Sequence, residues 1–209
     1  MKKFILVVGA TAFLLVTARA TSIVFTTFGP GDTYDQGNGY DVGTYFQTPV
    51  EDAAQFTAGT TGNLATVDLG LTGIRGSLSA NVYLYGDASD SPDNTNQIFL
   101  GSVLFPSPSS IVSFAVAGTV PVTLGSSYWL VLKPNTGDYG IWNFSSPAVP
   151  GSTDYSINDS TWNTYGAVLP AFRLTASSVS SVPDSGNTLF LLLGALASLL
   201  VLRPRLVRG

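Results

Sequence analysis

The chain has 209 residues, with nine Lys and Arg against thirteen Asp and Glu, and it contains neither His nor Cys. Without Cys it has no disulfide framework, thiol nucleophile or Cys-ligated metal, and without His it has no Ser-His-Asp triad or His-ligated zinc. Between residues 21 and 182, three cations face twelve acids. This acidic excess repels phosphate backbones and excludes a nucleic-acid partner.

Residues 1–20 have the three parts of a secretory signal peptide. Two lysines come first, the apolar run 4–16 follows, and the small residues Ala18 and Ala20 flank Arg19. We expect a signal-peptide helix that signal peptidase cleaves after Ala20. A short N-terminal membrane anchor is the alternative, but a helix of this length rises about 20 Å, less than the ~30 Å core of a bilayer.

Residues 21–178 show the period-two alternation of apolar and polar side chains that is typical of β-strands. The alternation is clearest in five segments: 67–71, 78–84, 112–116, 120–124 and 128–132. Gly-, Pro- and Asn-rich turn segments lie between them. We therefore predict an all-β domain of about nine to eleven strands, an antiparallel β-sandwich of jelly-roll-like type.

Two Asp-rich segments supply oxygen ligands of the kind that Ca²⁺ prefers. The first contains Asp32, Asp35 and Asp41 within the Gly-rich stretch 29–41, with Asn38 in the same spacing. The second contains Asp87, Asp90 and Asp93. Neither spacing matches an EF-hand loop. The alternative is that these residues form turns, for which Asp, Asn and Gly are well suited.

Aromatic residues in the segment 137–166 are candidates for a platform that stacks on sugar rings. The two principal candidates are Trp142 and Trp162, with Tyr139, Tyr155 and Tyr165 nearby. Large aromatic side chains also fill the cores of β-domains, which is the alternative for each of them.

Nothing in the chain forms a recognisable catalytic motif. Hydrolysis of a glycoside needs two carboxyl groups about 5–9.5 Å apart across one cleft. Glu51 is the one Glu of the chain and Asp52 follows it, but neighbouring residues of a strand point to opposite faces. We therefore expect no catalytic residues and no enzyme activity.

The C-terminal part begins with a linker, residues 179–187, and continues with an apolar run and a basic tail, residues 188–209. The run Leu189–Leu202 covers about 21 Å as a helix, which makes it a short transmembrane helix at best. Arg203, Arg205 and Arg208 follow it and favour a cytoplasmic end. These features fit either a plain single-pass anchor or a sorting signal read by a processing enzyme.

The linker contains the motif Val182-Pro183-Asp184-Ser185-Gly186. Together with the apolar run and the arginines, this motif resembles the PEP-CTERM class of bacterial sorting domains in its Val-Pro-Asp-Ser-Gly variant. One departure is Pro204, which interrupts the arginines. The resemblance implies that the chain is the substrate of an exosortase, a membrane enzyme that recognises such a motif and processes the tail, in bacteria that make extracellular polysaccharide.

The middle of the chain resembles the exported choice-of-anchor domains, most closely those of type R. The similar segments are 54–57 with 66–69, 81–85, and 124–132, in which Tyr128-Trp129 precedes an apolar run. This resemblance implies a β-sandwich core, and it carries no catalytic residues with it.

From these features we expect a non-catalytic, exported protein. Its precursor would be anchored in the inner membrane, and the processed protein would lie at the cell surface or in the extracellular matrix. The alternative is a carbohydrate-binding module for extracellular polysaccharide, assisted by Ca²⁺. A carboxylate-based glycan hydrolase is a third hypothesis, which requires an acidic pair in one concave site.

Overall fold

The computed structural model describes residues 21–45, 48–135, 139–157 and 161–177. The regular elements in these ranges are all β-strands, so the predicted all-β class is confirmed. Over the same ranges no helix is long and apolar enough to span a bilayer. The predicted signal-peptide helix and the predicted C-terminal transmembrane helix lie outside the described residues.

Thirteen strands follow one another in the described part of the chain. Their bounds are β1 Thr21–Thr26, β2 Tyr34–Tyr45, β3 Thr48–Thr57, β4 Gly62–Arg75, β5 Ser79–Asp87, β6 Pro92–Leu104, β7 Ser110–Ala115, β8 Pro121–Val122, β9 Ser127–Pro134, β10 Tyr139–Ser145, β11 Pro150–Ile157, β12 Trp162–Val168 and β13 Phe172–Ser177. The count exceeds the predicted one, partly because β2 occupies much of the Gly-rich stretch that was expected to be a loop.

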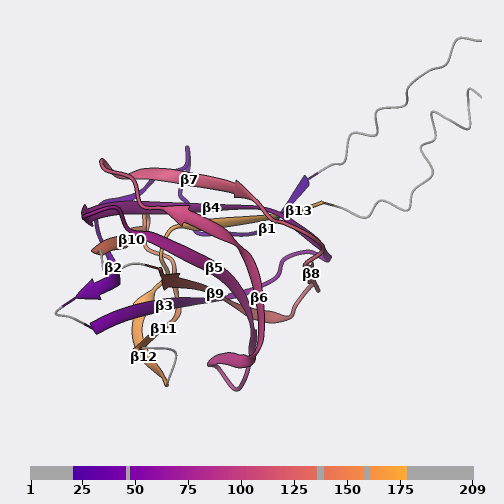
Figure 1. Cartoon of the computed structure of the whole chain (residues 1–209). Helices are drawn as coiled ribbons and strands as arrows, with labels where there is room; N and C mark the ends of the chain where they lie inside the picture. The colour runs from indigo at the N-terminus through magenta and orange to yellow at the C-terminus, as the bar shows by residue number, and fades with distance from the viewer. Residues whose placement is uncertain (1–20, 46–47, 136–138, 158–160, 178–209) are drawn as a thin grey trace, which may run out of the picture.

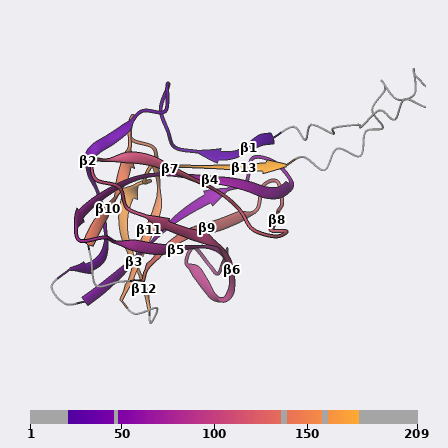
Figure 2. The same ribbon diagram turned by 45° about the horizontal axis from the view of Figure 1, so that its top comes forward.

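The strands belong to one continuous antiparallel sheet rather than to the two separate sheets that the sequence predicts. Its main order is β1-β13-β4-β10-β2-β3-β9-β5-β6, with β7 and β8 paired to β4, and β11 and β12 attached through β3. The sheet is continuous because β10 pairs with β4 and also with β2. It curls, so that β4, β7 and β13 lie over β3, β5, β6 and β9 (Figures 1 and 2).

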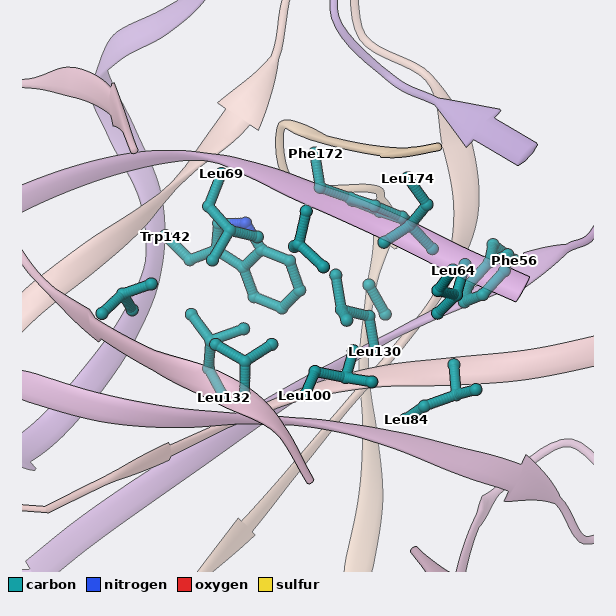
Figure 3. Packing of buried hydrophobic residues seen from close by; sticks show 14 of the residues in the cluster. Phe56, Leu64, Leu69, Leu84, Leu100, Leu130, Leu132, Trp142, Phe172 and Leu174 are labelled. Atoms are coloured by element: carbon teal, nitrogen blue, oxygen red, sulfur yellow. The ribbon is translucent and has the colours of Figure 1, made fainter. Parts of the chain in front are cut away.

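The apolar core lies between these two layers. From one layer, β4 and β13 contribute Leu69, Phe172 and Leu174, and from the other, β9 contributes Leu130 and Leu132 (Figure 3). All five side chains are fully buried. Burying one such side chain contributes about 1.5–3 kcal/mol, and these layers supply many of them. The period-two alternation predicted for β4, β5 and β9 is therefore confirmed as the pattern that fills the core.

The two layers approach closely where β6 lies near β7. A Cβ atom at Gly101 would lie 2.6 Å from the ring of Phe114, which is too close for any side chain. Gly101 thus lets the Phe114 ring rest against the backbone of β6, and this contact helps to close the curl of the sheet.

We predict that Leu69→Ala lowers the free energy of unfolding by about 2–5 kcal/mol, because Leu69 is fully buried and its removal leaves a cavity. The matched control is Leu124→Ala, whose side chain is 63% exposed and whose change should stay within about 0.5 kcal/mol. Urea unfolding of residues 21–177, followed by tryptophan fluorescence, measures both. Equal losses in the two variants would contradict this description of the core.

Candidate functional site

A small open pocket of about 170 Å³ lies where four strands meet. Asp41 comes from β2, Val50 and Asp52 from β3, Tyr155 from β11 and Tyr165 from β12. The register of the sheet brings them together, because Gly43 of β2 is paired with Val50 and Tyr155 is paired with Asp52. Directly paired residues of antiparallel strands project from the same face, so Tyr155 stands beside Asp52.

Asp52 is the most unusual residue of this pocket. It is only 3% exposed, and its Oδ2 atom has no hydrogen-bond partner. Burial raises the pKa of Asp52 well above its ordinary value, and the carboxylates of Asp41 and Glu51 raise it further. Asp52, Ala54 and Phe56 occupy every second position of β3, so they project from the same face of the strand. Ala54 and Phe56 belong to the core, and Asp52 therefore also points inward.

The three cations between residues 21 and 182 are engaged in other contacts. Arg173 forms ion pairs with Asp32 and Asp68, each at 2.7 Å. The Lys133 ammonium lies over the rings of Tyr83 and Tyr85, at 5.2 and 5.1 Å from their centroids. Arg75 donates a hydrogen bond to the carbonyl oxygen of Thr44. None of these three cations acts on the pKa of Asp52, and the charged groups that do, Asp41 and Glu51, are both acidic.

Tyrosine rings form the aromatic part of the pocket. Tyr165 is 52% exposed and meets the ring of Tyr155 edge-on, with centroids 5.4 Å apart. It also contacts the ring of Tyr40 at 4.9 Å. Burial raises the pKa of Tyr165, and the charges of Asp52 and Asp41 add to the effect. The hydroxyl of Tyr139 donates a hydrogen bond to Asp41 Oδ1.

Glu51 faces away from this pocket, as the sequence predicts for neighbours on a strand. It is paired with Ser156 on the opposite face of β3 and β11, where Asp154 is also buried. Burial raises the pKa of Asp154, while hydrogen bonds from Thr164 and Ser91 lower it. The two buried acids Glu51 and Asp52 therefore do not share one cleft.

The predicted sugar platform is wrong for Trp142. Its side chain is fully buried in the core, where Nε1 donates a hydrogen bond to the carbonyl oxygen of Ala171 (Figure 3). It therefore presents no face to a sugar. The alternation of β10 places Trp142 inward, so the alternative of a core aromatic applies.

Trp162 is partly exposed, at the start of β12. Its Nε1 atom donates a hydrogen bond to Asn94 Oδ1, and its ring meets Tyr85 edge-on with an interplanar angle of 86°. This contact belongs to a second small cluster that includes Trp129 and Val131. The perpendicular rings do not form a flat pair for stacking on a sugar.

In the first Asp-rich segment, for which Ca²⁺ ligation and turn formation are the alternatives, the acids have separate protein partners. Asp32 binds Arg173, and Asp35 accepts hydrogen bonds from the backbone and side chain of Asn38. Asp41 instead lies in the pocket. Since Tyr34–Tyr45 is a strand, Asp35 and Asp41 lie six positions apart along an extended backbone and do not come together around one ion.

The second Asp-rich segment is the turn between β5 and β6. Asp87 accepts hydrogen bonds from Gln55 and Trp129, and Asp93 accepts them from Thr95. Asp90 has a φ of 62°, a left-handed turn conformation that Asp tolerates. Over the residues described, no three His, Cys, Asp or Glu side chains gather into a group that fits a metal ion.

The remaining predicted site residues fall outside the described ranges. These are Ala18 and Ala20, the motif Val182–Gly186, and Arg203, Arg205 and Arg208.

The sequence pointed to the pocket only in part. The sequence predicts Tyr155 and Tyr165 as candidates for a sugar platform and Asp41 as a candidate Ca²⁺ ligand. It indicates Asp52 only as the neighbour of Glu51 in a candidate pair of catalytic carboxyl groups. Its inward register with Ala54 and Phe56 was the available signal, since an acid among inward-facing apolar residues is rare.

Comparisons with known proteins do not assign the chain to a family. No family model matches it, and no curated protein matches it at a significant level. Among solved structures it is similar to the cysteine protease and lectin-like domains of Cwp84, a surface layer associated protein of Clostridium difficile. The TM-score is 0.47 at 15% sequence identity, over 63% of this chain and 33% of that one. The chain thus spans about a third of that structure.

We predict that Asp52→Asn makes the domain more stable than the wild type at pH 7. The folded state raises the pKa of Asp52, so folding disfavours its ionised form. This cost is absent below the unfolded pKa, about 3.9, and grows as the pH rises toward the folded pKa. Urea unfolding from pH 3.5 to 8 should show the two proteins converging at acidic pH.

Asp93→Asn is the control with the opposite sign. Hydrogen bonds from Thr95 lower the pKa of Asp93, so the wild-type carboxylate favours folding above its unfolded pKa. This variant should be no more stable than the wild type at pH 7. A gain in Asp93→Asn equal to that in Asp52→Asn would show that the effect comes from net charge and not from the pocket.

Proposed function

We propose that this protein is a non-catalytic, exported protein of the cell surface or extracellular matrix, sorted through its C-terminal tail by an exosortase. The observation that carries the proposal is the place of the folded domain between the two predicted signals. Within the described residues, the first strand begins at Thr21, directly after the predicted cleavage site, and the last strand ends at Ser177, a few residues before the Val182–Gly186 motif.

The two ends of the domain are register partners. Thr21 of β1 is paired with Ser177 of β13, so the first and the last described residues lie side by side at one end of the domain (Figure 1). Removal of a signal peptide and processing of a tail would therefore leave every strand intact. The all-β architecture also fits the choice-of-anchor resemblance, and we retain the jelly-roll-like sandwich as part of the proposal.

The second candidate is a carbohydrate-binding module for extracellular polysaccharide. The buried Trp142 and the perpendicular rings at Trp162 weaken a flat stacking platform. The pocket favours binding of a small part of a sugar chain rather than stacking on a flat platform, because aromatic rings with a few polar groups are common in the binding sites of small ligands.

A glycan hydrolase stands as the third candidate, since Asp41 and Asp52 line the same pocket. Its test is the release of reducing ends from the producer's polysaccharide. We expect none from either the wild type or Asp52→Asn, and release by the wild type alone would replace the non-catalytic proposal.

We predict that the double variant Pro183→Ala, Asp184→Ala accumulates as an unprocessed membrane precursor, because it lacks the motif that the enzyme recognises. The matched control is Pro204→Ala, which changes a proline outside the motif and should be processed like the wild type. Mass spectrometry of the protein from the producing bacterium measures both ends. The mature N-terminus should be Thr21 in all three proteins, and full-length cytosolic protein beginning at Met1 would contradict the proposal.

The second candidate predicts that residues 21–178 bind the producer's exopolysaccharide saturably. Trp162→Ala tests the sugar platform: because the rings at Trp162 are perpendicular, we expect its affinity to stay close to that of the wild type, and a loss of about fivefold would show that Trp162 stacks on a sugar. Exposed Leu124→Ala serves as its control. Sedimentation with the polysaccharide in Ca²⁺ and then in chelator separates a metal-assisted mode from a metal-free one, and absence of binding in both leaves the structural role.

A further inference from the structure

The buried carboxylate of Asp52 needs an explanation that the proposed function does not supply. A buried charge without a partner is costly, so proteins usually pair it or neutralise it. Among the described residues, Oδ2 of Asp52 has no donor, and the neighbouring charges are those of Asp41 and Glu51, which are of like sign. Asp41 and Asp52 therefore line one open pocket to which no described residue contributes a cation.

A hard metal ion does not fit this arrangement. Ca²⁺ takes six to eight oxygen ligands at about 2.3–2.6 Å, which requires several carboxylates converging on one point. Among the residues described, no such group of acids exists, although Asp41 and Asp52 line one pocket. A ligand that fills this pocket would contact the rings of Tyr155 and Tyr165 as well as the carboxylate oxygens of the two acids.

An organic ammonium group meets both conditions. The face of a tyrosine ring attracts a cation within about 6 Å of its centroid, and carboxylates supply the opposite charge. Tyr155 and Tyr165 line the pocket beside the two acids. Its volume of about 170 Å³ also suits a small ion, since a protein cavity of about 150 Å³ holds a benzene ring.

We propose that the pocket formed by Asp41, Asp52, Tyr155 and Tyr165 binds the ammonium group of a small organic cation, no larger than one amino-sugar unit. Asp52 and Asp41 accept its charge, and the tyrosine rings cover its apolar surface. The proposal uses only the folded domain, so it stands apart from the proposed C-terminal sorting. Its test can fail while the tail is processed as expected, and the reverse also holds.

The experiment is calorimetric titration of the full chain, solubilised in a non-ionic detergent. Tetramethylammonium probes a permanent cation, glucosamine an amine on a sugar ring, and N-acetylglucosamine the same ring without the charge. We expect one or both cations to bind and N-acetylglucosamine to bind at least tenfold more weakly. Comparing the two cations shows whether the ammonium belongs to a sugar.

Variants connect the binding to the pocket. Asp52→Asn should weaken cation binding about tenfold, because it removes the buried charge and leaves the shape. Tyr165→Leu should weaken it about threefold, because it keeps an apolar side chain without the aromatic face. Asp93→Asn, which changes an exposed acid at the β5–β6 end, should bind like the wild type. Circular dichroism verifies that each variant is folded, and Tyr165→Leu serves as the second probe if Asp52→Asn is not.

The pH dependence adds a signature that a structural role would not give. Tetramethylammonium does not titrate, so a change in its affinity reports on the protein. The titratable groups around the site are those of Asp41, Glu51, Asp52, Tyr40, Tyr139, Tyr155 and Tyr165. Because the pKa of Asp52 is raised and binding uses its ionised form, affinity should still rise with pH above the range in which an ordinary aspartate ionises, and this rise should be smaller in Asp52→Asn.

Three results would overturn the proposal. The first is no binding of either cation to the wild type. The second is equal affinity for N-acetylglucosamine and glucosamine, which would indicate a neutral sugar site. The third is displacement of the bound ammonium by equimolar Ca²⁺ in the wild type, with Ca²⁺ binding lost in Asp52→Asn, which would indicate a metal site.

Discussion

The rest of the structure depends on the continuity of the hydrogen-bonded ladder through β4. This strand is paired with β13, β10, β7 and β8, so it joins the edge formed by β1 and β13 to the strands β10 and β2, through which the sheet continues. The chain has no Cys, so no disulfide can hold the layers together. Its stability therefore rests on apolar side chains that a single curled sheet brings face to face. Without the pairings of β4, neither the core nor the strands β10 and β2 would have their positions.

The pocket lies beside β3, along which the pairing changes from one partner strand to another. Strand β3 has three partners, β2, β9 and β11, and the pocket forms near the switch between them. One of its acids, Asp52, is buried, although an apolar residue would make the core more stable there. Natural proteins depart from the rules of core packing chiefly at functional sites, where binding is gained at the expense of stability. Asp52 fits that description, because it is buried and its Oδ2 atom has no hydrogen-bond partner.

The sequence predicted the class of fold and many strands, because alternation is a local property. Val67, Leu69 and Leu71 reveal the inward face of β4 without any knowledge of its partners. The site was harder to predict, because it depends on pairings between distant segments. Asp52 and Tyr155 are about a hundred residues apart and meet only through the register of β3 with β11. Trp142 shows the same limit, since its type suits a core and a sugar platform equally well, and only the position of β10 decides between them.

The pairing of Thr21 with Ser177 also determines how the domain would be displayed. Both ends of the described chain lie at one end of the domain, while β11 and β12 lie well away from that end in both views (Figures 1 and 2). A domain held through its C-terminal segment would therefore rotate about a single attachment point and point its pocket outward. In the location that we propose, at the cell surface, the pocket would then face away from the attachment point and toward material that arrives from outside the cell.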